Sequence, residues 1–196
     1  MSRRALLLCD LQIDVCGPGG ALGARSGATV HTAARGVLPR VAQVLERARR
    51  TGDLVVHARL AFDPAGLRRV NRSPAFAAFE EQGVLAEGTP GAEFCAEAAP
   101  LPGELVVTKG GVSPFSGTGL DERLRRAGVD TLLLGGVATN FVVESAARYA
   151  GDAGFAVFVL EDLCAAHSED LHRFAIEKTL PLFATITDSQ SAYPAL

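Results

Sequence analysis

Short apolar runs alternate with stretches of helical periodicity along the whole chain. Runs of strand length occur at 5–10, 54–60, 104–108, 131–137, 156–160 and 184–187. Helical spacing of apolar residues predicts helices over 29–50, 118–127, 139–150 and 168–180. Continuous apolar strands that alternate with helices are typical of a sheet buried on both faces. The pattern therefore predicts an α/β fold: a three-layer α/β/α, Rossmann-like domain with a mostly parallel six-stranded sheet and right-handed crossovers.

The segment 62–102 departs from this alternation. It is rich in Pro, Gly and Ala, with weak periodicity, and long irregular segments often form the walls of a pocket. No internal repeat, low-complexity tract or linker divides the 196 residues. We therefore expect residues 1–196 to form a single domain.

Charge and cysteine usage narrow the class of protein. The net charge of −3 gives no reason to expect nucleic acid or an anionic membrane as partner, and we interpret the arginine clusters at 47–50 and 123–126 as solvated helix faces. No apolar run reaches the roughly 18–20 residues that span a bilayer. The apolar stretch after Ser2-Arg3-Arg4 ends at Asp10, too early for a secretory signal. The scattered cysteines favour reduced thiols in the cytoplasm.

Two charged residues follow predicted strands of the sheet. Ligands bind beyond the carboxyl ends of the strands in such folds; Asp10 ends the first strand and Lys109 follows the third. Only Lys109 and Lys178 of the 19 basic residues are lysine, which indicates a role for Lys109 that arginine cannot fill. Taken singly, Asp10 could be a turn former and Lys109 a surface residue. Together they predict a shielded crevice that holds both side chains. Burial there would raise the pKa of Asp10 and lower that of Lys109, and their mutual attraction would do the reverse.

Three separate motifs in the same order carry a family resemblance. They are Leu6-Leu7-Leu8-Cys9-Asp10-Leu11-Gln12 with Asp14 and Gly17-Pro18-Gly19-Gly20; Val107-Thr108-Lys109 leading to Ser113, Phe115 and Gly117-Thr118-Gly119-Leu120; and Gly136 to Arg148, followed by Glu161-Asp162. This pattern resembles the isochorismatase-like (cysteine hydrolase) superfamily. The resemblance implies a parallel sheet flanked by helices, a small-molecule substrate, and assembly as a homodimer or homotetramer.

The resemblance also implies roles for particular residues. In amidase members an Asp takes the proton of a Cys thiol, a Lys supports the charge, and backbone N–H groups stabilise the oxyanion beside a non-proline cis peptide. These roles map onto Asp10, Lys109, the backbone of Ala138 and Val142, and the bond Val137-Ala138. The nucleophile position itself is Val142. Valine has no heteroatom, so the covalent route is closed at that position.

The chain lacks the metal-binding pair of some members of the superfamily. Nicotinamidase-like members carry an Asp-x-His pair where this chain has Arg59-Leu60-Ala61-Phe62, and we interpret His57 as a packed core residue; we expect no metal and no cofactor. Arginines of the irregular segment are candidates for clamping a carboxylate or, equally, plain surface charge. The candidate substrate contacts are Gln12, Arg59, Arg72, Phe115, Asn140 and Phe141.

Three functions remain open from the sequence. The first is a metal-independent hydrolase of a small, anionic substrate, acting on a vinyl ether or a C–N bond, with Asp10 as general acid or base beside Lys109. True isochorismatases of the superfamily also lack the cysteine, whereas residues 137–144 are more similar to ureidoacrylate-type amidases. The second is an amide or ureido hydrolase with a substitute thiol such as Cys16, which could equally be an apolar filler. The third is a catalytically silent ligand-binding or scaffold protein.

Overall fold

The sheet runs through the middle of the molecule. The computed structural model describes residues 3–66 and 68–194. Its strands are β1 (Arg3–Cys9), β2 (Leu54–Leu60), β3 (Leu105–Lys109), β4 (Val129–Val137), β5 (Ala156–Ala165) and β6 (Thr185–Thr187). They form one six-stranded sheet in the order β3-β2-β1-β4-β5-β6, and every neighbouring pair is parallel. The predicted sheet is confirmed, with its strands parallel throughout.

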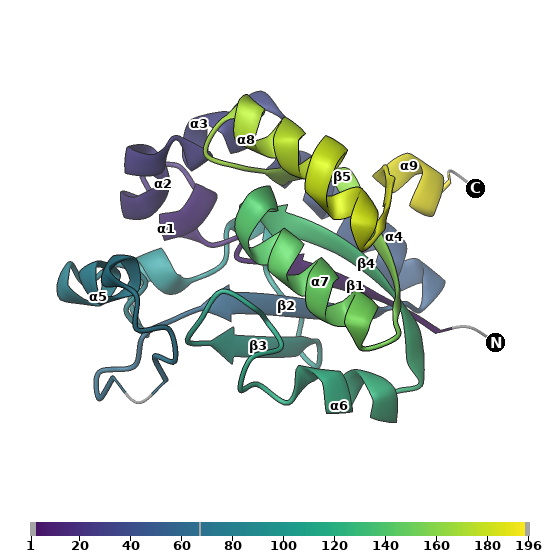
Figure 1. Cartoon of the computed structure of the whole chain (residues 1–196), viewed down its shortest axis with the longest axis horizontal. Coiled ribbons are helices and arrows are strands. Elements are labelled where there is room, and N and C mark those ends of the chain that lie inside the picture. The colour runs from purple at the N-terminus through teal and green to yellow at the C-terminus, as the bar shows by residue number, and fades with distance from the viewer. Residues whose placement is uncertain (1–2, 67, 195–196) are drawn as a thin grey trace.

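Helices cover both faces of this sheet (Figure 1). Helices α6 (Leu120–Arg126) and α7 (Glu144–Asp152) lie on one face, and α4 (Val37–Thr51) and α9 (Ser189–Ala192) lie on the other. The remaining helices are α1 (Ile13–Cys16), α2 (Ala21–Ser26), α3 (Ala28–Ala34), α5 (Pro74–Glu81) and α8 (Glu169–Phe174). Short 3-10 or π-helical turns occur at Pro90–Ala92, Ala96–Ala98, Thr139–Val143, Ala175–Thr179 and Leu180–Leu182. The three-layer prediction is confirmed.

The sequence periodicity missed one helix boundary. The predicted helix over 29–50 is two helices, α3 and α4, because Gly36 between them adopts a left-handed conformation with φ 62°. That conformation interrupts the helical hydrogen-bond ladder at little cost in glycine. The break allows α2 and α3 to pack beside α1 at the end of the sheet where the strands finish.

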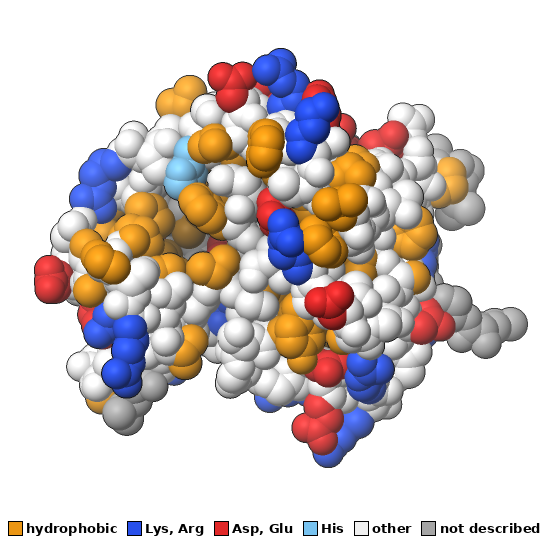
Figure 2. Space-filling view, in the orientation of Figure 1, with side chains coloured by type: hydrophobic (Ala, Val, Ile, Leu, Met, Phe, Trp, Pro, Cys, Tyr) orange, Lys and Arg blue, Asp and Glu red, His pale blue; other side chains and the backbone are white. Residues whose placement is uncertain are grey.

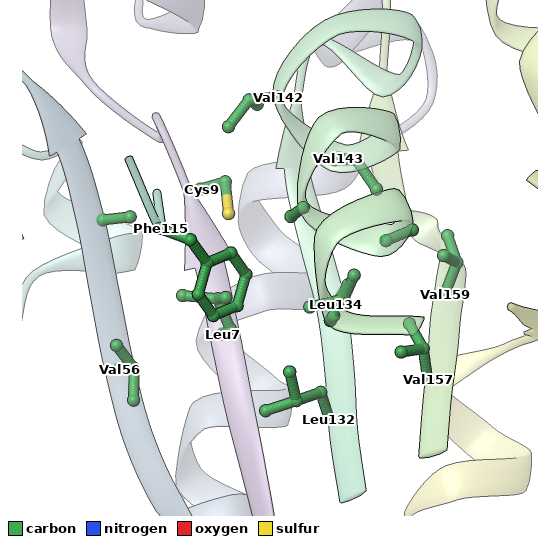
Figure 3. Close-up of a cluster of buried hydrophobic side chains, with 14 of the residues drawn as sticks. Leu7, Cys9, Val56, Phe115, Leu132, Leu134, Val142, Val143, Val157 and Val159 are labelled. Carbon is green, nitrogen blue, oxygen red and sulfur yellow. The ribbon is translucent and has the colours of Figure 1, made fainter. Parts of the chain in front are cut away.

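Alternating residues of β1 pack into two separate hydrophobic clusters, one on each face of the sheet. Leu7 and Cys9 face the α6–α7 side, where they join the cluster in Figure 3, whereas Leu6 and Leu8 face the α4 side. This alternation is the period-two geometry of a strand. A third, smaller cluster consists of Leu60, Phe62, Phe76, Val84 and Leu85. It lies at the carboxyl end of β2 and brings the irregular segment against the sheet.

The predicted arginine faces are solvated in part. Arg125 and Arg126 are exposed and pair with acidic residues one helical turn earlier. Arg49 differs, because it lies against Glu104, with 2.7 Å between its Nε and the carboxylate. None of the helices in the described ranges is long and apolar enough to cross a bilayer.

Candidate active site

Asp10 and Lys109 meet at the carboxyl edge of the sheet. The Lys109 ammonium donates to Asp10 Oδ2 over 2.8 Å and to the Gly111 carbonyl over 3.0 Å. Lys109 is 1% exposed and Asp10 is 7% exposed. The two residues come from β3 and from the end of β1, which β2 separates in the sheet. The prediction that they share a shielded crevice is confirmed.

The backbone directs Asp10 out of the sheet. Its N–H still donates to the Ala58 carbonyl of β2 over 2.8 Å, so the residue remains tied to the strand pairing. Its φ of 56° is left-handed, a conformation that few non-glycine residues adopt, although Asp tolerates it better than most. The chain therefore turns sharply at the residue that carries the carboxylate.

Burial dominates the electrostatics of Asp10. Burial raises the pKa of this carboxyl, and the charge and hydrogen bond of Lys109 lower it; the net direction is upward. Its second oxygen, Oδ1, is buried and has no hydrogen-bond partner among the described residues. The carboxyl therefore holds one oxygen on Lys109 and leaves the other for a ligand.

A helical turn after β4 forms the opposite side of the site. The Val137-Ala138 peptide bond is cis, as the family resemblance implies. The N–H groups of Phe141 and Val143 donate to the Ala138 carbonyl, so those two donors are engaged within the turn. Val142 is buried, and Figure 3 shows it beyond Cys9 in the direction in which β1 runs.

A cavity of about 420 Å³ opens above the charged pair. Figure 2 shows the hollow on the side of the molecule where α5 lies, with hydrophobic side chains around it. The only charged side chains among the described residues that line it are Asp10 and Lys109. The polar lining consists of Ser26, Asn71, Ser73 and His167. The apolar lining consists of Val15, Leu22, Ala28, Leu60, Ala75, Phe76, Phe79, Leu85, Val112, Val137, Ala138, Phe141 and Val142.

Asp14 ties two walls of this cavity together. Its Oδ2 accepts from the Leu85 N–H over 2.9 Å, and its Oδ1 accepts from the Ala21 N–H over 3.1 Å. Leu85 belongs to the irregular segment, and Ala21 begins α2. One carboxylate thus anchors both sides of the cavity to the loop that follows Asp10.

Two predicted substrate contacts serve the scaffold instead. The Gln12 amide donates to the carbonyls of Leu60 and Ala92 and accepts from the Leu60 N–H, all within 2.8 Å. Gln12 is fully buried and its amide is occupied. Arg59 bonds to Thr108 and pairs with Glu93, while its neighbour Leu60 lines the cavity. Both expectations are corrected.

The remaining predicted contacts divide between the cavity and the core. Phe141 lines the cavity, as do Ala138 and Val142. Phe115 instead stacks on Tyr149, with 4.5 Å between ring centroids, and neither Asn140 nor the exposed Arg72 lines the cavity. The arginine clamp is therefore corrected as well: Arg68 and Arg69 pair with Glu87 and Glu80.

The substitute thiol does not face the cavity. Cys16 is buried, with its Sγ 4.0 Å from the Sγ of Cys95 and 3.5 Å from the Gln12 carbonyl oxygen. The hydrogen bond to Cys95 and then burial raise its pKa. A protonated, buried thiol outside the cavity wall is not placed to attack a substrate.

No metal centre is evident among the described residues. Residues 3–66 and 68–194 contain no group of three or more His, Cys, Asp or Glu side chains placed to hold an ion. His57 is buried, with its Nε2 3.0 Å from Glu104. Burial lowers the His57 pKa against the opposing effect of Glu104, which fits the predicted core role.

Sequence reasoning missed a buried contact behind the turn. Thr139 Oγ1 lies 2.8 Å from His172 Nδ1, and both residues are almost fully buried. His172 Nε2 lies 3.4 Å from Glu161. These residues come from three elements far apart in the sequence, so no local spacing could reveal the contact. Ser168 caps α8, the helix that carries His172, by accepting a hydrogen bond from the Leu171 N–H.

Comparison with known proteins identifies the family of this chain. The family model described as the isochorismatase domain matches residues 4–191. The chain belongs to the isochorismatase family. A family relative, the ureidoacrylate amidohydrolase of Methylobacterium radiotolerans, is 30% identical over 97% of this chain and 78% of its own length.

Further relatives extend the likeness. An uncharacterized isochorismatase family protein of Escherichia coli O157:H7 is 40% identical over 42% of this chain, and the alignment spans 44% of that relative. The chain thus spans less than half the length of that curated relative. The crystal structure of an isochorismatase family protein from Desulfovibrio vulgaris superposes with a TM-score of 0.86 at 28% identity, covering 98% of this chain and 97% of the other.

Proposed function

We propose that this isochorismatase-family protein is a metal-independent hydrolase in which Asp10, supported by Lys109, moves the proton and water is the nucleophile. The observation that carries the proposal is the buried contact between these two side chains at the floor of a cavity. An ion pair this deeply buried is costly and is often replaceable by apolar residues without loss of stability. Its presence at a cavity favours a chemical role.

Water as nucleophile follows from the side chains at hand. The family resemblance assigns the position of the nucleophilic cysteine to Val142, which lines the cavity and has no heteroatom with which to form a covalent intermediate. In the proposed amide hydrolysis, ionised Asp10 takes a proton from water while the water oxygen bonds to the carbonyl carbon. The C–N bond then breaks, and Asp10 returns the proton to the leaving nitrogen. Backbone N–H groups of Ala138 and Val142 are the proposed donors to the oxyanion.

Ether hydrolysis is the alternative reaction for the same residues. Protonated Asp10 would donate its proton to the enol-ether carbon, and water would add to the resulting cation and return a proton to Asp10. The hemiketal would then divide into a ketone and an alcohol. The raised pKa of Asp10 supports this proton-donor role. The ureidoacrylate relative, which is similar over 97% of this chain, favours the C–N reaction.

The test replaces Asp10 by Asn and measures turnover of isochorismate, of N-carbamoyl compounds and of simple amides. Asp170→Asn on α8 is the matched control, because its side chain is exposed. We expect Asp10→Asn to lose at least ~100-fold in kcat, the usual range for a general acid or base, while circular dichroism shows a folded protein. Full turnover in the Asp10→Asn variant would remove Asp10 from the mechanism. Tight ligand binding without turnover of any substrate in the wild type would favour a silent binding protein.

The oligomeric state is proposed on the same family resemblance. We expect a homodimer or homotetramer in solution. Light scattering coupled to size-exclusion chromatography measures the mass directly, and a value near 20.4 kDa would show a monomer.

A further inference from the structure

The walls of the cavity are chemically unlike its floor. Above Asp10 and Lys109, the wall is built mainly by the third hydrophobic cluster and the side chains packed against it, Leu22, Phe79 and Val112 among them. Two aromatic rings of α5 contribute, Phe76 and Phe79, whose centroids are 5.7 Å apart. Phe62 packs against Phe76 from outside the cavity, at 6.1 Å. A ligand body would therefore meet mainly aliphatic and aromatic carbon, with Ser26, Asn71, Ser73 and His167 as the polar part of the lining.

The charges at the floor cancel. The Lys109 ammonium has three protons, of which two are held by Asp10 and by the Gly111 carbonyl. When Asp10 is ionised the pair is neutral, and no other cation lines the cavity in the described part of the chain. A carboxylate on the substrate would enter an apolar enclosure without a counter-ion of its own. Burying such a charge is strongly unfavourable.

The unpartnered oxygen of Asp10 favours a ligand that carries a hydrogen-bond donor. Oδ1 is buried and accepts no hydrogen bond from the described residues. A buried acceptor without a donor is costly, so a ligand N–H or O–H placed there gains a charge-assisted hydrogen bond. The cavity volume of about 420 Å³ equals that of roughly 14 water molecules at about 30 Å³ each. That space accommodates a ring or a branched chain beside the reacting group.

We infer that the site selects an uncharged substrate: an apolar body in the α5 wall and a hydrogen-bond-donating end, such as a primary amide, on Asp10. This inference rests on the proposed function and specifies its substrate class. It replaces the anionic substrate that the sequence favoured, because the arginines expected to bind a carboxylate are paired or lie outside the cavity. The substrate named for the ureidoacrylate relative carries a carboxylate. We therefore expect the two proteins to differ in the side chains of the cavity wall rather than at the positions of Asp10 and Lys109.

The experiment compares two probes that share a primary amide. Phenylacetamide has an apolar ring, whereas succinamate has a carboxylate at its far end. Binding to the wild-type protein is measured at pH 8 by isothermal titration calorimetry, with each mixture analysed for hydrolysis afterwards. We expect phenylacetamide to bind at least ten-fold more tightly than succinamate. Equal or tighter binding of succinamate would overturn the inference.

Variants of the wall locate the selectivity. Phe79→Ala should weaken phenylacetamide binding about ten-fold and leave succinamate unchanged, and Phe79→Arg should improve succinamate binding by supplying a cation. The matched control is Phe174→Ala, since Phe174 is 59% exposed on α8 and outside the cavity. Phe141→Ala at the half-exposed rim is the second test if Phe79 variants do not fold. Unchanged phenylacetamide binding in the folded wall variants would also overturn the inference.

The two proposals fail in different ways. If phenylacetamide binds selectively but neither amides nor ethers are turned over, the hydrolase proposal fails and the apolar site stands. If the protein hydrolyses only amides that carry a carboxylate, the hydrolase stands and the apolar selectivity is wrong.

Discussion

Replacing Lys109 by Met should destabilise the protein much more at pH 8 than at pH 5. Methionine keeps most of the volume of the buried aliphatic stem and removes the ammonium. The Asp10 carboxylate, 7% exposed, would then lie in the core without its cation. The Gly111 carbonyl would also lose the donor that reaches it over 3.0 Å.

The magnitude follows from these two losses. Removing one partner of a buried ion pair costs about 3–5 kcal/mol in unfolding free energy, which is the expected loss at pH 8. Without Lys109 the pKa of Asp10 rises further, because burial is no longer opposed. Lowering the pH from 8 to 5 therefore shifts Asp10 of the folded variant toward its protonated, uncharged form. The loss at pH 5 then falls toward that of the hydrogen bonds alone, about 1–2 kcal/mol.

Urea denaturation at both pH values measures the difference, with the wild type as reference in each buffer. Asp10→Asn leaves Lys109 as the unpaired charge and should also destabilise, whereas the double variant Asp10→Asn/Lys109→Met removes both charges. The double variant should be more stable than the sum of the single losses predicts, by about 0.5–3 kcal/mol, since the residues are in contact. Additive losses, or a loss below about 1 kcal/mol at pH 8, would refute a tightly buried pair.

Three further predictions concern other side-chain contacts and the cysteines. Burial would raise the pKa of Glu104, but the hydrogen bonds from Arg49 and its neighbours prevail and hold this pKa at about 2, below its ordinary 4.5. The ionised carboxylate therefore contributes its full stabilisation above pH 4.5. We expect about 1–2 kcal/mol of unfolding free energy, after allowance for solvent screening, to be lost as the pH falls to 2. Urea denaturation across this range should show a flatter profile for Glu104→Gln, and identical profiles would contradict the assignment. Thr139→Val should lower the unfolding free energy by about 1–3 kcal/mol, because His172 loses its buried partner; an unchanged urea midpoint would count against that contact. All four cysteines are buried, so a thiol reagent should modify none within minutes in the native protein, leave turnover intact and modify four after unfolding; rapid reaction of Cys95 would contradict this.

The sequence predicts both the layer architecture and the charged pair, because both follow from local patterns: the spacing of apolar residues and the residues at the ends of strands. The strand over 54–60 is β2 with the same bounds, since the apolar residues Leu54, Val55 and Val56 open it and Thr51-Gly52-Asp53 ends the preceding helix. The pattern predicts that Asp10 and Lys109 lie together, because the carboxyl ends of parallel strands meet at one edge of a sheet.

The substrate contacts were less readable because they depend on orientation and on distant partners. Arg59 and Leu60 are adjacent in β2, and their side chains point to opposite sides. Leu60 pairs with Lys109 in the sheet and lines the cavity, whereas Arg59 does not line it. Gln12 has its amide occupied by Ala92, 80 residues away. A motif in a sequence indicates that such a residue matters, and it does not distinguish scaffold from binding.

The origin of the cavity in two unlike parts of the chain has a practical consequence. Asp10 and Lys109, the groups proposed to move the proton, lie at strand ends, whereas much of the wall belongs to a connection that is held to Asp14 through Leu85. Residues 71–84 can therefore be randomised or exchanged for the corresponding loop of a relative while the strands stay untouched. A library confined to that stretch would redirect the protein toward other compounds without rebuilding its chemistry.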